Sequence, residues 1–241
     1  MNREHKRQIV ESSNSDVVGT LNDSVYRYLS ERLISGRLGP GDKLSLRSVA
    51  EALGVSMMPV REAVARLAAE KALIVEPKKA AFVPLMSAAG FRDITRVRIA
   101  IEGTAAAMAA GAASAENLDE IRRFEVHFRS LSGDQSAVRQ AAVAANHAFH
   151  FAVYRAAQSA ELISIIERLW LRVGPIINLD LRENPERMRF GGAIRYHAAM
   201  LAGIETRDPE AARAALAADI QGASDFILSQ GRLPDEPEKE H

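Results

Sequence analysis

From position 25 onward, apolar residues recur at intervals of about one helical turn. The first group of them is short. It consists of Val25, Leu29, Leu33 and Ile34. This spacing places the side chains on one face and predicts an amphipathic helix. Asn22 or Asp23 can cap its start, and Ser35-Gly36 ends it. A turn then follows at residues 39–41, which read Gly-Pro-Gly.

Two further helices are predicted close behind the turn. The pattern gives one over residues 46–53, ended by Gly54, and one over residues 58–71. Ser56 stands where it can cap the second helix. Pro59 falls in the first turn, where its missing N–H costs no hydrogen bond.

Two short apolar runs come next, at residues 73–75 and 81–83, with Pro77-Lys78-Lys79 between them. Short apolar runs around a proline-containing turn predict a small hairpin with a basic tip. Helix, turn, short helix, turn, longer helix and hairpin is the order of a winged helix-turn-helix. We therefore predict a DNA-binding domain in this part of the chain.

From Ser87 onward alanine is abundant and the predicted helices are long. They cover residues 87–112, 115–131, 135–157, 161–180, 191–206 and 208–230. Few residues here favour strands, so an all-helical bundle is expected. The fold class is accordingly mainly α, with an N-terminal winged helix-turn-helix and a C-terminal all-helical bundle. The expected organisation is a flexible tail over 1–17, the DNA-binding domain over 18–84, a ligand-sensing and dimerisation domain over 85–230, and a disordered tail over 231–241.

Composition narrows the class of protein. The chain of 241 residues is 47% hydrophobic and contains no cysteine, which excludes disulfides and thiolate zinc sites. No apolar run is long enough for a membrane span, and the N-terminus has no apolar signal core. We therefore expect a cytoplasmic protein. Residues 1–84 hold 13 Lys and Arg against 10 Asp and Glu, while the remainder holds 18 against 21, which is the asymmetry of a DNA-facing N-terminal half.

Basic residues stand where a winged helix-turn-helix meets DNA. Arg61 lies in the first turn of the predicted recognition helix, and Arg47 opens the helix before it. Recognition helices contact bases and phosphates through their N-terminal residues. Lys78 and Lys79 at the hairpin tip could reach phosphates or a minor groove. Each of these charges alone is more commonly a solvated surface group, and the ordered combination carries the prediction.

Residues 21–84 resemble the GntR family of transcription regulators. The resemblance rests on Arg32-Leu-Ile-Ser-Gly36, Pro40-Gly41, Leu53-Gly-Val-Ser56 and Pro59-Val-Arg-Glu-Ala63, together with Leu44, Ala50, Leu67 and Glu70. It implies operator contacts by Arg47 and Arg61. The family usually has an arginine after Val-Ser and a glycine in the wing, where this chain has Met57 and Ala80. The expected DNA-binding set is Arg47, Ser56, Met57, Arg61, Lys78 and Lys79.

Four polar residues stand out among the C-terminal helices. Asn146 and His150 are four positions apart and share a helix face, while His197 and Asp219 lie on later helices. Small or apolar neighbours flank each of the last three, so their polar groups would project into an apolar bundle, as in helical metal sites. The alternative is that each histidine is an ordinary hydrogen-bonded core residue, and the spacing alone does not show that the helices meet.

The bundle resembles the FCD effector domain of the FadR-type branch of the GntR family. The resemblance rests on Arg98-Ile-Ala-Ile-Glu102, Asn146-His-Ala-Phe-His150, His197-Ala-Ala-Met-Leu-Ala-Gly-Ile-Glu205 and Arg207-Asp208. It implies one divalent metal, Zn²⁺, Ni²⁺ or Mn²⁺, bound by Asn146, His150, His197 and Asp219. The last place, a histidine in relatives, is filled here by Asp219, which shifts the preference toward harder ions.

The resemblance also implies a small organic-acid effector. Arg98 is the candidate for its carboxylate, and an ion pair with Glu102 one turn away is the competing role. The function predicted is a ligand-responsive regulator, expected to be a repressor, that binds a palindromic operator as a homodimer. The alternatives are a metal-free effector pocket, a DNA-binding dimer without an effector, and a metal-dependent enzyme. The fused DNA-binding domain and the lack of a nucleophile–base set disfavour the enzyme.

Overall fold

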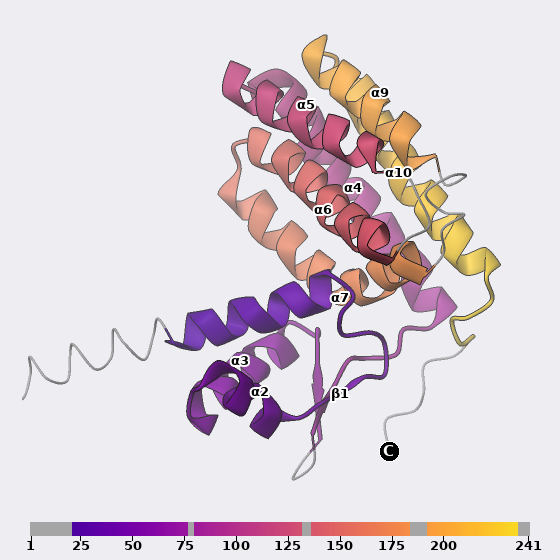
Figure 1. Ribbon diagram of the computed structural model, residues 1–241. Coiled ribbons are helices and arrows are strands. Elements are labelled where there is room, and N and C mark those ends of the chain that lie inside the picture. The colour runs from indigo at the N-terminus through magenta and orange to yellow at the C-terminus, as the bar shows by residue number, and fades with distance from the viewer. Residues whose placement is uncertain (1–20, 77–79, 132–135, 184–191, 236–241) are drawn as a thin grey trace, which may run out of the picture.

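Two large apolar cores organise the described part of the chain in the computed structural model, which covers residues 21–76, 80–131, 136–183 and 192–235 (Figure 1). One core lies within residues 25–83 and receives Leu171 from further along the chain. The other gathers apolar residues between Phe91 and Ile227. We call the first part, residues 21–83, the N-terminal domain and the helices from residue 88 onward the bundle. The predicted fold class is confirmed.

The N-terminal domain is built from short elements. They are a helix over residues 21–34, β1 (Lys43–Leu44), α2 (Leu46–Leu53), α3 (Met57–Ala69), β2 (Ile74–Val75) and β3 (Ala81–Phe82). Ser45 caps α2 by accepting a hydrogen bond from the backbone N–H of Ser48. Gly54 ends α2 with φ of 64°, in the left-handed region that glycine adopts without a steric penalty. These local signals explain why the predicted bounds of α2 agree with the observed ones.

The wing contains one strand more than the sequence predicted. The strand order is β1-β3-β2, and Phe82 of β3 is paired with both Lys43 and Ile74 in antiparallel register. The expected two-stranded hairpin is therefore part of a three-stranded sheet. β1 has two residues, too few to show a period-two pattern, and the sequence therefore did not predict it.

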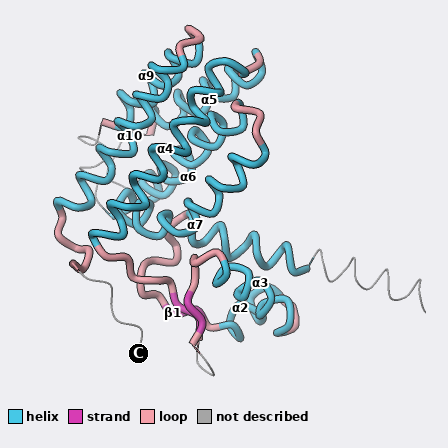
Figure 2. Tube along the Cα trace, turned by 180° about the vertical axis from the view of Figure 1, so that it is seen from behind, coloured by secondary structure: helices cyan, strands magenta, loops and turns pink. Residues whose placement is uncertain are grey.

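The bundle follows the predicted succession of helices. It contains α4 (Ala88–Ala112), α5 (Ala115–Ser130), α6 (Ser136–Ala156), α7 (Ala160–Glu183), α9 (Ala193–Glu205) and α10 (Pro209–Ser229). α10 packs along α4 and α9, and α6 packs against α5 and α7 (Figure 2). Ser114 and Asn117 form a capping box at the start of α5, and Asp208 caps α10. Among the described residues, no helix is both long and apolar enough to span a membrane.

The two parts meet on α7. Leu171 joins the core of the N-terminal domain, whereas Trp170 and Val173, its neighbours on the same helix, belong to the core of the bundle. The side-chain amide of Asn178 donates a hydrogen bond to the backbone carbonyl of Ile34. α7 is therefore shared by both cores.

The described end of the chain contacts the bundle. Residues 231–235, expected to belong to a disordered tail, lie against the bundle. Leu233 packs on its core, and the carbonyl of Pro234 accepts a hydrogen bond of 2.8 Å from the N–H of Ala88. The polar composition of this segment concealed that single apolar side chain. The predicted N-terminal tail over 1–17 and residues 236–241 lie outside the described residues.

Candidate DNA-binding surface and metal centre

The arginines predicted to contact DNA are exposed on the helix-turn-helix. Arg47 lies in the first turn of α2 and forms an ion pair of 2.9 Å with Glu51, one turn further on. Arg61 lies near the start of α3, where it is exposed. Ser56 is the N-cap residue of α3 and is also exposed, and its side chain makes no capping hydrogen bond. All three side chains are therefore accessible to DNA.

The two adjacent methionines at the start of α3 differ in exposure. Met57 is half-buried against the core of the N-terminal domain, while the side chain of Met58 is 60% exposed. Of the two, Met58 offers more surface to a partner, and it was not in the predicted contact set. Lys78 and Lys79 lie outside the described residues.

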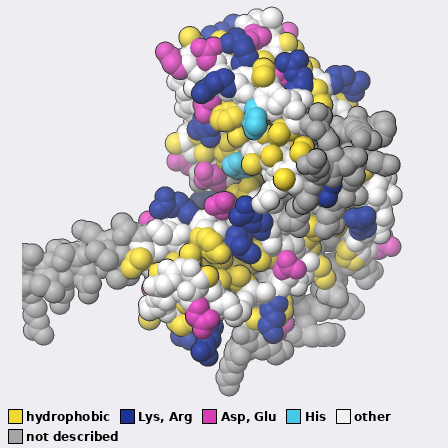
Figure 3. Space-filling model, viewed as in Figure 1, with side chains coloured by type: hydrophobic (Ala, Val, Ile, Leu, Met, Phe, Trp, Pro, Cys, Tyr) yellow, Lys and Arg dark blue, Asp and Glu magenta, His cyan; other side chains and the backbone are white. Residues whose placement is uncertain are grey.

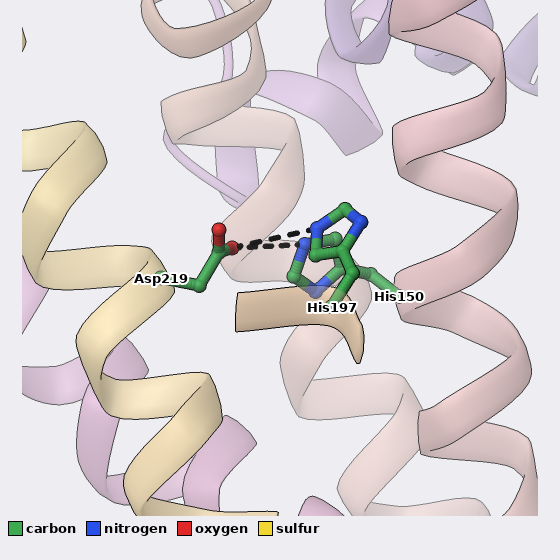
Figure 4. Close-up of side chains that lie close together, drawn as sticks. All are labelled: His150, His197 and Asp219. Carbon is green, nitrogen blue, oxygen red and sulfur yellow. Dashed lines mark ion pairs between the residues drawn. The ribbon is translucent and has the colours of Figure 1, made fainter. Parts of the chain in front are cut away.

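Three of the four predicted metal ligands converge inside the bundle, each from a different helix (Figure 4). His150 comes from α6, His197 from α9 and Asp219 from α10. Nε2 of His150 lies 3.2 Å from Oδ2 of Asp219, and Nε2 of His197 lies 3.8 Å from the same oxygen. One potential ligand atom from each residue lies within 4.8 Å of the others, and all three residues are buried.

Aromatic rings hold His197 in place. Its imidazole stacks on Phe149 with centroids 4.2 Å apart, and Phe128 lies 4.7 Å away on a tilted plane. Both ring nitrogens are buried without a hydrogen-bond partner among the described residues, because 3.8 Å to Asp219 is too long for a hydrogen bond. A buried histidine with neither nitrogen satisfied is unusual and calls for a further group.

A small cavity of about 30 Å³ adjoins this cluster. Asn146, the fourth predicted ligand, lines it together with His150 and Asp219. Arg98, the predicted effector contact, lines it as well. The sequence therefore identified four residues that line one cavity, although they come from three different helices.

The electrostatics favour an ionised carboxylate at Asp219. Burial alone would raise the pKa of Asp219, but the interactions with His150 and His197 outweigh it and hold that pKa well below its usual range. Burial lowers the pKa of His197, against the attraction of Asp219. Two imidazoles, a carboxylate and the amide oxygen of Asn146 are a donor set suited to a borderline divalent cation.

Behind His150 lies a polar network centred on Glu102. Nε of Arg98 donates to Oε1 of Glu102 at 2.7 Å, and the indole N–H of Trp170 donates to Oε2 at 3.2 Å. The hydroxyl of Tyr154 also donates to Oε2. That hydroxyl lies 3.1 Å from Nδ1 of His150. Burial, reinforced by Glu102, raises the pKa of Tyr154 well above 10, so the phenol keeps its proton.

This network contains one of the two roles that the sequence allowed for Arg98, the ion pair with Glu102. Its guanidinium is engaged by Glu102 through Nε and Nη2, so the ion pair is present. An effector contact by Arg98 remains a prediction. Tyr154 and Trp170 were missed. Tyr154 stands four residues after His150, the spacing that linked Asn146 to His150, and it could have been found in the same way.

A second, larger cavity lies between the N-terminal domain and the bundle. Its volume is about 660 Å³, and it is lined by residues of the helix over 21–34, of the turn that follows it, of α6 and of α7, among them Arg27, Arg37 and His147. Basic and acidic side chains surround the hollow between the two parts in Figure 3. His147 stands edge-on to Trp170 at 5.4 Å, and Trp170 lines the small cavity. Trp170 and His147 thus separate the two cavities.

A winged helix-turn-helix joined to a helical bundle with a buried polar pocket is the architecture of a DNA-binding transcription regulator. Comparison with known families agrees. The model of the bacterial regulatory proteins of the gntR family matches residues 21–83, and that of the FCD domain matches residues 93–222. The chain belongs to the GntR family and carries an FCD domain; it is a transcription regulator and not an enzyme.

Similar proteins have the same architecture. The HTH-type transcriptional regulator McbR of Escherichia coli K12 is 32% identical over 196 residues, which cover 80% of this chain and 86% of McbR. The solved structure of E. coli McbR/YncC superposes with a TM-score of 0.78 at 28% identity, covering 88% of this chain and 99% of that one. A probable D-xylose utilization operon transcriptional repressor of Paenarthrobacter nicotinovorans is 28% identical over 82% of this chain and 84% of its own length.

Proposed function

We propose that this regulator is a repressor whose bundle binds one divalent cation and, through it, a small carboxylate. His150, His197 and Asp219 would hold the cation, with Asn146 as the fourth ligand. The observation that carries the proposal is His197, which is buried with both ring nitrogens unpartnered next to an ionised Asp219. Burying an unsatisfied imidazole costs about 1–3 kcal/mol, and a cation between His197 and Asp219 would remove that cost.

The cavity size constrains how an effector would enter. About 30 Å³ is enough for an ion with a water molecule, whereas pockets for organic ligands measure about 300–1,000 Å³. A carboxylate effector would therefore have to enlarge the cavity by moving part of its wall. Trp170, Ile177 and Leu181 of α7 form one side of that wall.

Movement of α7 would reach the DNA-binding domain directly. The same helix contacts the N-terminal domain through Leu171, Gly174 and Asn178. We therefore infer that effector binding shifts α7 and reorients the recognition surface formed by Arg47, Ser56, Met58 and Arg61. Such a regulator would act in the cytoplasm, where operator DNA lies.

We also infer a homodimer that binds a palindromic operator, because a single small DNA-binding domain makes few contacts and two-fold dimers are the usual solution. α4 supports this with a stripe of the exposed residues Val97, Ala100 and Met108 and the half-buried Thr104, at spacings of three and four residues. Val97 is 42% and Met108 40% exposed. The hydroxyl of Thr104 is satisfied by the carbonyl of Ala100 at 2.8 Å, so it can enter an apolar contact.

Sedimentation tests the dimer. The wild type should be dimeric at micromolar concentration, and a Val97→Glu, Met108→Glu double variant should be monomeric. Ile165→Glu, which replaces an equally exposed apolar residue of α7, is the control and should remain dimeric. A monomeric wild type, or a double variant that stays dimeric, would contradict this inference.

Elemental analysis tests the metal, using protein purified without chelator or affinity tag. We expect close to one equivalent of zinc, nickel or manganese per chain. Thermal-shift screening with short organic acids and sugar acids, followed by DNA-binding measurements with the acids that respond, tests the effector. Less than about a tenth of an equivalent, with no calorimetric signal for added Zn²⁺, Ni²⁺ or Mn²⁺, would favour a metal-free pocket in which Asp219 pairs with a protonated imidazole. No response to any acid would favour a DNA-binding dimer without an effector.

A further inference from the structure

The polar network behind the metal centre fixes the direction of each of its hydrogen bonds. Glu102 is paired with the guanidinium of Arg98 at 2.7 Å and is fully buried. A carboxylate in such a pair has no proton and can only accept hydrogen bonds. Both remaining partners of Glu102, the indole N–H of Trp170 and the hydroxyl of Tyr154, must therefore donate to it.

The direction of the Tyr154 bond determines the proton position on His150. A phenol has one hydrogen, and Tyr154 directs it to Glu102. Its oxygen can then only accept from Nδ1 of His150, 3.1 Å away. In the neutral imidazole, a proton on Nδ1 leaves Nε2 with an unshared electron pair.

That electron pair faces a carboxylate. Nε2 of His150 lies 3.2 Å from Oδ2 of Asp219. Two electron-rich atoms at this distance repel each other unless a cation or a proton lies between them or beside them. We propose that Tyr154, oriented by Glu102, is a positioning residue that holds neutral His150 as its Nδ1–H tautomer and leaves Nε2 free to bind a cation.

In this role the network orients a metal-binding histidine, which packing alone does not require. A hydrogen bond to the far nitrogen of a ligating histidine fixes its tautomer and the direction of its ring. A carboxylate or a carbonyl oxygen usually accepts this hydrogen bond. Here the acceptor is a tyrosine hydroxyl, which is itself held by a carboxylate. This role in metal binding rests on the proposed metal site, but the tautomer of His150 can be measured without metal.

The experiment is long-range ¹⁵N NMR of the full-length protein with ¹⁵N-labelled histidine. Metal is removed with a chelator and the spectra are recorded near pH 8, above the ordinary pKa of about 6.5. His150→Gln assigns the signal. The wild type should show His150 protonated on Nδ1, and Tyr154→Phe, which removes only the hydroxyl, should shift it toward the Nε2–H tautomer. Tyr26→Phe is the matched control, because it removes another hydroxyl bonded to a carboxylate, that of Glu70, and the His150 signal should not change.

Calorimetry with Zn²⁺ gives the second readout. Tyr154→Phe should weaken zinc binding by about 10–100-fold, and Tyr26→Phe should leave it unchanged. A wild type with the Nε2–H tautomer, or a Tyr154→Phe variant that keeps Nδ1–H, would overturn the proposal. If the tautomer responds as expected but no metal binds to the wild type, the positioning role of Tyr154 stands and the proposed metal function fails.

Discussion

Gly174 of α7 packs directly on the backbone of Ile34, at the end of the first helix. A Cβ atom at Gly174 would lie 2.8 Å from the Cα of Ile34 and 3.1 Å from its carbonyl oxygen. Pro175 follows in the same helix and cannot donate the N–H that a helix would direct to the carbonyl of Leu171. The seam between the two domains thus coincides with a local irregularity of α7.

The first prediction concerns this seam. Gly174→Ala should lower the free energy of unfolding by about 1–3 kcal/mol, because both contacting atoms belong to the backbone and cannot rotate away. Gly111→Ala in α4 is the control. Its Cβ would meet nothing within 4 Å, and it should leave stability unchanged or raise it by up to about 1 kcal/mol. Denaturant unfolding measures both variants, and a Gly174→Ala protein as stable as Gly111→Ala would contradict the close approach.

The second prediction concerns DNA. Arg61→Ala should weaken operator binding by about 1–3 kcal/mol through the loss of a base or phosphate contact. Arg96→Ala serves as the control, since Arg96 is an exposed arginine of the bundle paired with Asp93 at 2.9 Å. Fluorescence anisotropy on an operator selected from random duplexes, repeated at several salt concentrations, measures the difference. Equal affinities for the two variants would remove Arg61 from the recognition surface.

The third prediction concerns the metal centre. His197→Gln should abolish the thermal stabilisation by added Zn²⁺, which amounts to about 2.7 kcal/mol when free metal is 100 times its Kd. His127→Gln, an exposed histidine of α5, should retain it. Asp219→His should tighten zinc and nickel binding by adding a nitrogen ligand. Retained stabilisation in His197→Gln would exclude this residue as a ligand.

The pH dependence of metal binding follows from burial. Because burial lowers the pKa of His197, protons compete with the metal at this residue only below the usual histidine range. Binding should therefore persist as pH falls from 8 to about 6 and weaken below that. Zinc titrations between those limits measure it, and a loss of binding already above pH 7 would contradict the prediction.

The fourth prediction concerns His147 at the junction of the two cavities. Burial, reinforced by the interactions with His150 and Arg155, lowers its pKa from 6.5 to about 4. The unfolded chain therefore binds more protons at this residue between pH 4 and 6.5, so stability is full above 6.5 and falls as the pH drops toward 4. In His147→Phe, the free energy of unfolding should fall by roughly 1–3 kcal/mol less than in the wild type over this pH range. Urea unfolding at several pH values compares the two proteins; an unchanged slope would show that other groups cause the acid sensitivity.

The helices could be predicted because residues close in the sequence determine where each helix begins and ends. Gly54 ends α2 in the left-handed region, and Ser87 caps α4 by accepting from the N–H of Gly90. The prediction placed α2 at its observed bounds and α4 one residue early. β1 could not be predicted, since its two residues form a strand only through pairing with β3, far along the chain.

The candidate site, likewise, could be predicted only in part. His150 and Asn146 share a helix face, which the sequence shows, whereas the meeting of His197 with Asp219 depends on the packing of α9 against α10. The role of Trp170 depends on packing even more strongly, because it reaches Glu102 across 68 positions of sequence. Exposure is likewise tertiary information: Met57 and Met58 are adjacent and chemically identical, yet the core covers one and leaves the other open.

Trp170 is the chain's one tryptophan, and it is fully buried between the two cavities. Its indole borders the site proposed for the cation and also contacts His147, which lines the interdomain cavity. The tryptophan emission of the unlabelled protein therefore originates at a single point. A change in colour or intensity on adding metal, acid or operator can be attributed to that point without a dye, so the native protein carries its own optical probe of the region between the proposed cation site and the interdomain cavity.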